Sequence, residues 1–402
     1  MKTLLSEKSI VIFGAGKIGR SFIGQLFNRA GYKIVFVDVD LLIITEINRR
    51  KSYKVVIKSD HDEVIEITDV SGIHANDTDK VVNAIAHCNL IATSVGKNAI
   101  EKILPIIARG IEKRIIVQPD YPLDIILAEN SRDCRKIIKD GLIALLTNNF
   151  PIDSYVGLIE TSIGKMVPII PKDISDKDPL LVYAEPYNTL ILGKNEFRNL
   201  IPNVEGLSPK ENIKAWVDRK AFIHNLGHAA AVYFSHYKYP ELNYLYEVLA
   251  DSEVNSFTRQ AMKQSAKALV LEYPNEFTEN DLDLHIEDLI NRFQNKALGD
   301  TVYRVGHDLR RKLNVDDRVG GAIKLAQRTG VPFDKLIEVF ALGLLFRSKD
   351  ESNQYYLDDL KFLEEFKMDA IKVLTSICGF KVQTDNIIIK AIMNKYELFS
   401  KM

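Results

Sequence analysis

The first 170 residues alternate short β-branched runs with stretches of helical periodicity. This alternation is typical of a doubly wound α/β sheet with parallel strands. The runs that we interpret as strands are residues 10–13, 34–37, 90–93, 115–117 and 142–146. Residues 53–57 and 63–68 flank a polar SDHD segment and predict an inserted hairpin, and residues 181–185 predict one more strand.

From residue 210 onward the pattern changes to amphipathic helices, with apolar residues three and four positions apart in segments such as 213–237 and 333–346. The turn-rich stretch NLIPNVEGLSPKEN precedes this change. A single hydrophobic core stops growing at roughly 250 residues, so a chain of 402 residues favours two domains. We predict an α/β domain over residues 1–200 and an all-α domain over residues 201–402.

Composition and charge exclude several classes of protein. The chain is 46% apolar and 27% charged, which is typical of a globular protein, and its formal net charge of -1 provides no basic field for nucleic acid or a membrane surface. Cys88, Cys134 and Cys378 form no CxxC pair, which favours a reducing compartment over a disulfide framework or a zinc site. No signal peptide or membrane-length apolar run is apparent. We therefore expect a cytoplasmic protein.

A glycine motif follows the first predicted strand. The sequence SIVIFGAGKIGRSFIG places Gly14, Gly16 and Gly19 in GxGxxG spacing around Ile18, where a strand meets a helix. In a Rossmann fold these glycines allow a tight turn, close approach of a pyrophosphate and helix packing on the strand. The second strand ends at Asp38, nineteen residues past Gly19, where a carboxylate can accept hydrogen bonds from a ribose diol. The motif predicts a bound dinucleotide.

The residues near Asp38 favour NAD over NADP as the cofactor. Val39 and Asp40 follow it, and no adjacent arginine is present to hold a 2′-phosphate. The third strand exits through Ser94 and Val95, which are small enough to lie beside a ribose or nicotinamide. Alternatively, the glycines merely shape a turn or bind S-adenosylmethionine, and the exit after the third strand is an ordinary loop.

A candidate chemical site lies in the helical half. The segment DRKAFIHNLGHAAAVYF carries Lys220, Asn225 and His228, which fall near 0°, 140° and 80° around a regular helix at about 100° per residue. A lysine acts as a base if burial or nearby positive charge lowers its pKa. Alternatively, Lys220 is a solvated surface lysine and His228 a core histidine.

His224 and His228 also have the i, i+4 spacing of a helical metal site. Asn225 occupies the position where an HExxH motif has its glutamate, and no third ligand is evident. We therefore expect no metal.

Taken in order, these motifs resemble the polyol-specific long-chain dehydrogenase family. FGAGKIGRSFIG is similar to the family's N-terminal signature, ILAEN to its pre-catalytic segment, and Lys220-x4-Asn225-x2-His228 to its catalytic helix. RFQNKALGDTVYRVGHDLRRKLNVDDR is similar to a further family stretch. The resemblance implies an N-terminal Rossmann domain, a C-terminal helical domain, and metal-independent hydride transfer between NAD and a polyol in the cleft between them.

The resemblance also implies roles for individual residues. Lys220 is expected to be the general base in oxidation, Asn130 and Asn225 to hydrogen-bond the reacting oxygen, and His228 to orient the substrate.

Arg304 and Lys312 match the family's basic substrate-binding positions, eight residues apart. With Arg310 and Arg311 they form a cationic cluster in a nearly neutral chain, and guanidinium groups suit bidentate binding of phosphate. We select Arg304, Arg311 and Lys312 as the substrate-binding set, although the sequence does not distinguish Arg310 from Arg311. Alternatively, the cluster is a solvated helix end.

Two positions depart from the family pattern: Gly164 replaces an expected aspartate, and His307 replaces an expected arginine. The expected reaction is still NAD-dependent, reversible oxidation of a sugar-alcohol phosphate, with D-mannitol 1-phosphate giving D-fructose 6-phosphate. The alternatives are a hexuronate (tagaturonate or fructuronate) reductase, a mannitol 2-dehydrogenase acting on unphosphorylated substrate, or a non-catalytic NAD(H)-binding regulator. We expect a monomer or weak homo-oligomer whose partner is a small polyol or ketose phosphate.

Overall fold

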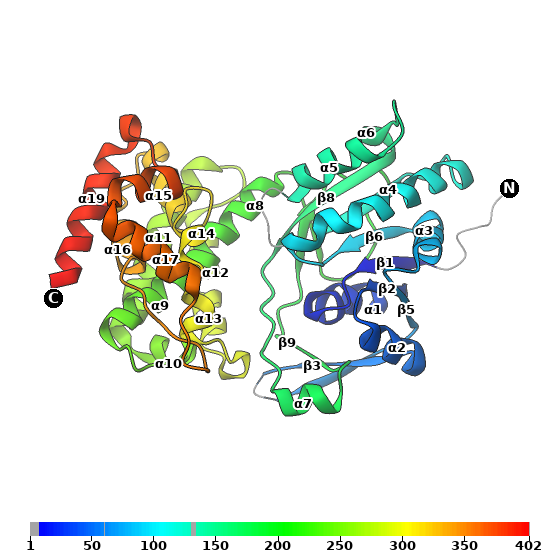
Figure 1. Ribbon diagram of the computed structural model, residues 1–402, viewed down its shortest axis with the longest axis horizontal. Coiled ribbons are helices and arrows are strands. Elements are labelled where there is room, and N and C mark those ends of the chain that lie inside the picture. The colour runs from blue at the N-terminus through cyan, green and yellow to red at the C-terminus, as the bar shows by residue number, and fades with distance from the viewer. Residues whose placement is uncertain (1–7, 60, 130–133, 402) are drawn as a thin grey trace. The chain divides into compact units, whose positions relative to one another are not determined.

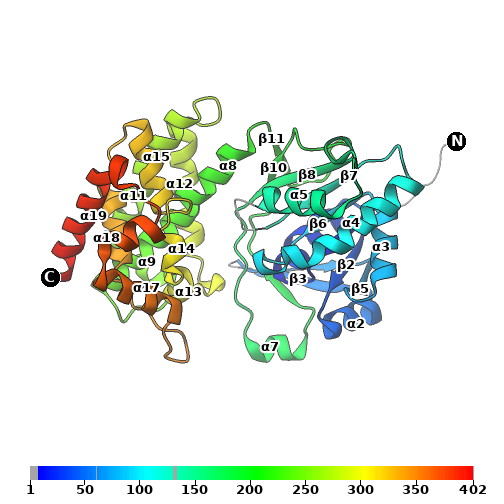
Figure 2. The same ribbon diagram turned by 45° about the horizontal axis from the view of Figure 1, so that its top comes forward.

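The computed structural model of this chain describes residues 8–59, 61–129 and 134–401. Its contacts divide the chain into two compact units, which meet in the sequence at Val217 and Asp218 (Figures 1 and 2). The first unit is built on β-sheets and the second on helices, which confirms the predicted combination of an α/β fold with a helical domain.

An eight-stranded sheet is the framework of the first unit, with the order β11-β10-β8-β7-β6-β1-β2-β5 (Figures 1 and 2). The strands from β8 to β5 are parallel to their neighbours, whereas β10 is antiparallel to β8 and parallel to β11. The strands are β1 (Ser9–Phe13), β2 (Lys33–Asp38), β5 (Val70–His74), β6 (Leu90–Thr93), β7 (Leu123–Leu127), β8 (Val156–Ile163), β10 (Leu190–Gly193) and β11 (Leu207–Lys210).

Helices cover both faces of this sheet. Side chains alternate across a strand, so Ile10 and Ile12 enter one hydrophobic core while Val11 and Phe13 enter the other. The first core includes residues of the π-helix η1 (Gly19–Gly24), α1 (Gln25–Arg29) and α2 (Leu41–Arg50). The second includes residues of α3 (Thr78–His87), α4 (Ile100–Val117) and α5 (Cys134–Leu145). The sheet is therefore doubly wound, as predicted.

Two of the predicted strands are wrong. Residues 115–117 are the end of α4, and residues 142–145 are the end of α5. Short apolar runs fit either a strand or the buried face of a helix, and in both helices they continue a helical spacing of apolar positions. The strands in this part of the sheet are β7 and β8, which the sequence analysis did not identify.

The predicted hairpin is confirmed and belongs to a second, three-stranded sheet with the order β4-β3-β9. β3 (Tyr53–Ile57) pairs antiparallel with β4 (Glu63–Ile67) and parallel with β9 (Val182–Ala184). The short helices in the rest of the first unit are η2 (Lys97–Ala99), α6 (Ile152–Tyr155) and α7 (Lys172–Lys177).

Helix α8 (Ile213–Arg219) carries the chain from the first unit into the second, where α11 (Ser252–Glu272) packs against α9, α12, α15 and α16. The other helices of the second unit are η3 (Lys220–Asn225), α9 (Leu226–Lys238), α10 (Leu245–Ala250), α12 (Glu279–Phe293), η4 (Lys296–Leu298), α13 (Val302–Gly306), α14 (Leu309–Lys312), α15 (Gly320–Thr329), α16 (Asp334–Gly343), α17 (Leu357–Met368), α18 (Ala370–Lys372), η5 (Val373–Ile377) and α19 (Val382–Lys401). Among the described residues, none of the helices combines the length and the apolar character that a membrane span requires.

Candidate active site

The glycine motif forms a tight loop between β1 and η1. Gly14 has φ +98°, a conformation that side chains rarely adopt. A Cβ on Gly19 would overlap the carbonyl oxygen of Gly14, whereas a Cβ on Gly16 would meet no atom within 4 Å. Ile18 packs against the core beneath the loop. The loop is thus closed toward the protein at Gly19 and open at Gly16, as a pyrophosphate site requires.

Asp38 stands at the end of β2, beside this loop. Its Oδ2 atom accepts a hydrogen bond of 2.6 Å from the backbone N–H of Ala15, and its Oδ1 atom accepts one of 2.9 Å from Asp40. The carboxylate is half-buried, so part of it remains accessible to a ribose. The structure therefore joins the two halves of the predicted nucleotide motif.

The loop after β6 is fixed from two sides. The Ser94 hydroxyl donates to the carbonyl of Gly14 at 3.1 Å. The carboxylate of Glu129 accepts hydrogen bonds from the backbone N–H groups of Val95 and Gly96, each at 2.9 Å. Burial raises the pKa of Glu129.

Glu129 was not singled out by the sequence analysis, although it stands in the ILAEN motif that was. Its neighbour Asn130, predicted to contact the reacting oxygen, lies outside the described residues.

The predicted catalytic helix is not a regular α-helix. Residues Lys220–Asn225 form the π-helix η3 between α8 and α9, and the N–H of Leu226 donates to the carbonyl of Ala221, five residues back. Because a π-helix closes its turn over five residues, Lys220 and Asn225 lie nearer to one face than the predicted 140° separation. A single π-turn within a helix often marks a functional site.

Lys220 is half-buried within this helix. Burial lowers the pKa of its ammonium group to about 8; Arg318 and Arg311 act in the same direction, and Asp317 opposes them. An amine with this pKa exchanges a proton near neutral pH, as a general base must.

His228 stacks on Phe293, with ring centroids 3.9 Å apart, and its Nε2 atom is buried without a hydrogen-bond partner in the described structure. Burial, together with the charges of Arg318 and Arg304, holds the pKa of His228 well below its ordinary value. The imidazole is therefore neutral near neutral pH and keeps one ring nitrogen for another molecule.

The His224 ring packs edge-on against His228 and Phe293. Among the described residues, no group of three or more His, Cys, Asp or Glu side chains is arranged to hold a metal ion.

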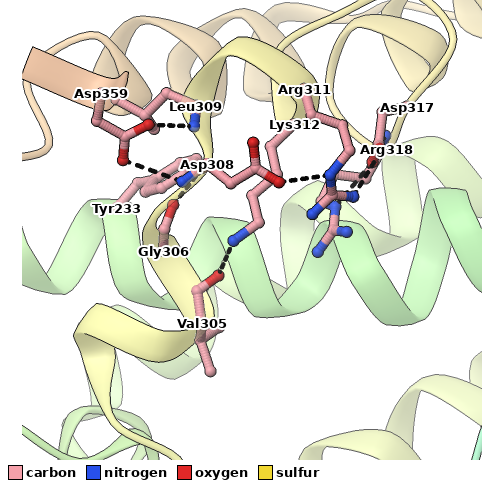
Figure 3. A network of polar contacts seen from close by, with 10 residues as sticks. All are labelled: Tyr233, Val305, Gly306, Asp308, Leu309, Arg311, Lys312, Asp317, Arg318 and Asp359. Carbon is pink, nitrogen blue, oxygen red and sulfur yellow. Dashed lines mark hydrogen bonds and ion pairs between the residues drawn. The ribbon is translucent and has the colours of Figure 1, made fainter. Parts of the chain in front are cut away.

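The predicted substrate-binding cations differ in their surroundings, and Figure 3 shows those of Lys312 and Arg311. Lys312 is 3% exposed, and its ammonium donates to the carbonyl of Val305 at 2.6 Å. Burial lowers the pKa of Lys312 well below its ordinary value, and Arg318 contributes to the shift. A buried ammonium held by a carbonyl lacks a directly bonded counter-charge, so an anion beside it would stabilise its charged form.

The two predicted arginines already have carboxylate partners. Arg304 pairs with Asp300. Arg311 donates to Asp308 from Nε at 2.5 Å and to Asp317 from Nη1 at 2.8 Å (Figure 3). Arg311 is thus braced by two acids, an arrangement that resembles structural support more than ligand binding.

The structure shows the surroundings of His307 and Gly164, the two residues that depart from the family pattern. The Nδ1 atom of His307 donates a hydrogen bond to the carbonyl of Tyr303 at 2.9 Å, and its ring stacks on the Tyr303 ring. A Cβ on Gly164 would lie 3.6 Å from the ring of Tyr187, an ordinary contact distance.

Two family models match the chain and together cover most of its length. The mannitol dehydrogenase Rossmann domain matches residues 8–206, and the mannitol dehydrogenase C-terminal domain matches residues 212–398.

Several solved structures have a similar fold. The ternary complex of Pseudomonas fluorescens mannitol 2-dehydrogenase with NAD and D-mannitol is 15% identical, with a TM-score of 0.74, and the match covers 98% of this chain and 92% of that one. An octopine dehydrogenase structure is 12% identical, with a TM-score of 0.50, and the match covers 93% of this chain and 98% of that one. At these identities the similarity concerns the fold alone.

Proposed function

This chain belongs to the mannitol dehydrogenase family of oxidoreductases acting on CH–OH groups, and on that premise we propose that it oxidises a sugar-alcohol phosphate reversibly with NAD. The substrate pair that we assign is D-mannitol 1-phosphate and D-fructose 6-phosphate, the reaction of a mannitol-1-phosphate 5-dehydrogenase. The observation that carries the assignment is the buried ammonium of Lys312, which is bonded to a carbonyl and lies within electrostatic reach of Arg318.

The glycine loop fits NAD. The open space at Gly16 leaves room for a pyrophosphate, and the half-buried carboxylate of Asp38 is available to a ribose diol. A 2′-phosphate at the same place would face the negative charge of Asp38. When bound, NAD supplies the acceptor for the hydride that leaves the carbinol carbon.

Lys220 is the group that we assign to the proton of the reacting hydroxyl. With a pKa of about 8 it is partly deprotonated near neutral pH, so its Nζ atom can take the proton in oxidation and return it in reduction. Asn225, on the same π-helix, is assigned as a hydrogen-bond donor to the reacting oxygen. The Nε2 atom of His228, which has no hydrogen-bond partner among the described residues, is assigned to a substrate hydroxyl, which would satisfy a buried polar atom.

Phosphate recognition is assigned to Lys312, with Arg304 as a second cation. The bound phosphate would compensate the buried ammonium, which is otherwise destabilised by desolvation. We keep Arg311 as a supporting residue because Asp308 and Asp317 already hold its guanidinium.

One observation favours an unphosphorylated substrate as the second candidate. The acids that pair with Arg304 and Arg311 cancel part of the positive charge that a phosphate dianion needs. A hexuronate, which has one negative charge, or a neutral ketohexose would tolerate this arrangement better. The catalytic assignment of Lys220 is the same in both cases.

A substrate panel tests the proposal. The full chain is assayed for oxidation of NADH, and in parallel of NADPH, with fructose 6-phosphate, fructose, tagaturonate and fructuronate, each with and without EDTA. We expect fructose 6-phosphate and NADH to give the highest kcat/KM, with no effect of EDTA. Turnover confined to unphosphorylated sugars would reject the phosphate assignment. Tight NADH binding without turnover of any ketose would favour a regulator instead of an enzyme.

A further inference from the structure

We propose that Arg318 binds the phosphate of the substrate together with Lys312, and that it is the principal specificity-determining arginine of this site. The inference rests on the proposed function, because it assigns a residue to the phosphate of that substrate. The sequence had favoured Arg311 as the arginine beside Lys312, and it gave Arg318 no function.

The side chain of Arg318 is held in place through its Nε atom, which leaves the terminal nitrogens of its guanidinium available for a ligand. Its Nε atom donates to Oδ1 of Asp317 at 2.9 Å, and its backbone N–H donates to the same oxygen at 2.6 Å. The side chain is 9% exposed. Across the described residues, its two terminal nitrogens have no hydrogen-bond partner. A guanidinium fixed through Nε keeps the terminal N–H groups with which arginine binds phosphate oxygens.

The neighbouring arginines are committed to acids of the chain. Both oxygens of Glu365 accept hydrogen bonds from Arg310, at 3.0 and 2.9 Å. Arg311 is held by two carboxylates, and one of these, Asp317, also holds Arg318. Asp317 therefore lies between two arginines. Of these two, Arg318 is the one whose terminal nitrogens both lack a hydrogen-bond partner within the part of the chain that the structure describes.

Packing places the segment that carries Arg318 against the π-helix of Lys220. A Cβ on Gly321 would lie 2.6 Å from the Phe222 ring, so glycine at this position allows the start of α15 to approach η3 closely. In Figure 3, Arg318 and Lys312 extend in the same direction from their backbones, toward the side on which Val305 lies. An oxyanion between them would meet one ammonium and one guanidinium, a pair suited to a phosphate dianion.

Arg318 also has an electrostatic link to the proposed base. Its charge lowers the pKa of Lys220, in addition to burial and against the opposing charge of Asp317. Removal of the charge should therefore raise the apparent pKa of the base and move the acid limb of the oxidation rate to higher pH. A residue with a merely structural role would not shift this limb.

The test compares Arg318→Ala, Arg318→Lys and the control Arg310→Ala in the full chain. The main readout is the ratio of kcat/KM for fructose 6-phosphate to kcat/KM for fructose, because a general loss of folded enzyme lowers both terms equally. We expect Arg318→Ala to reduce this ratio roughly 10- to 100-fold, the effect of losing hydrogen bonds between charged groups. Arg318→Lys should recover part of the ratio and keep the pH profile, and Arg310→Ala should change neither.

A second readout covers the case in which turnover of fructose is too slow to measure. Inorganic phosphate should inhibit the wild-type enzyme in competition with fructose 6-phosphate, and its inhibition constant should rise in Arg318→Ala by a similar factor.

Different experimental results would overturn the proposed function and the assignment of Arg318. A wild-type enzyme that does not reduce fructose 6-phosphate overturns the proposed function and this inference with it. A wild-type enzyme that does reduce it, combined with an unchanged ratio and phosphate inhibition in Arg318→Ala, overturns the assignment of Arg318 alone.

Discussion

The carboxylate of Asp38 accepts a hydrogen bond from the backbone of Ala15, and this contact fastens the end of β2 to the glycine loop. Oδ2 thus helps to organise the loop and Oδ1 accepts from Asp40, while the half-buried carboxylate keeps further acceptor capacity for a ligand. The side chain that helps to shape the loop is therefore the one to which we assign the choice of cofactor.

Replacement of Asp38 should relax the preference for NADH over NADPH. Asp38→Asn removes the negative charge at nearly constant size, and Asp38→Ala removes the carboxylate altogether. We expect the ratio of kcat/KM for NADH to that for NADPH to fall roughly 10- to 100-fold in both variants, since hydrogen bonds to charged groups contribute at this level. An unaltered ratio would contradict the assignment of Asp38 to the ribose.

Replacement of Lys220 should abolish most turnover without loss of the cofactor. A positioned general base contributes roughly 100- to 10,000-fold, so Lys220→Ala should lower kcat by that factor and leave the dissociation constant of NADH nearly unchanged. The matched control is Lys238→Ala, at the end of α9, whose ammonium pairs with Glu253. Full activity in Lys220→Ala would remove this residue from the mechanism.

The two directions of the reaction should respond oppositely to pH. The pKa of Lys220 is lowered to about 8, so below that pH the amine becomes protonated and cannot accept a proton. Oxidation should slow about tenfold per pH unit below 8, while reduction, which needs the ammonium, should slow above 8. Initial rates measured against pH at saturating cofactor would show these two dependences. If oxidation and reduction both slowed on the same side of pH 8, a group other than Lys220 would control the proton transfer.

Alanine substitutions at two glycines of the loop should have different effects, one on stability and the other on cofactor binding. Gly19→Ala places a Cβ on the carbonyl oxygen of Gly14, so the loop must shift and the melting temperature should fall. Gly16→Ala meets no protein atom within 4 Å, so stability should hold while the Cβ occupies space needed by the pyrophosphate. Thermal melting and NADH titration separate the two effects. Equal loss of stability in both variants would show that Gly16 also has a packing role.

Much of the fold could be predicted because its signals are local. Residues 10–13, 34–37 and 90–93 are apolar runs bounded by turns, and all three are strands of the sheet. Residues 115–117 and 142–145 are similarly apolar but continue amphipathic helices, and local composition cannot separate these cases.

The candidate site was less predictable because its geometry depends on distant partners. The π-turn at Lys220–Asn225 leaves the residue spacing unchanged, so a helical wheel drawn for a regular α-helix misplaces Asn225. The carboxylate that engages Arg304 is four residues away and could have been suspected from the sequence. The acid that engages Arg310 is Glu365, which only the tertiary structure brings near.

The short sheet that joins β3 to β9 depends on a pairing between distant parts of the sequence, so it can be completed only after β9 has been synthesised. Val55 pairs with Val182, a residue that is synthesised long after the β3–β4 hairpin has emerged. Until then the nascent chain carries a strand edge with free backbone donors and acceptors, the type of edge that promotes aggregation. A pause in translation before β9 would therefore prolong the time during which this edge is exposed.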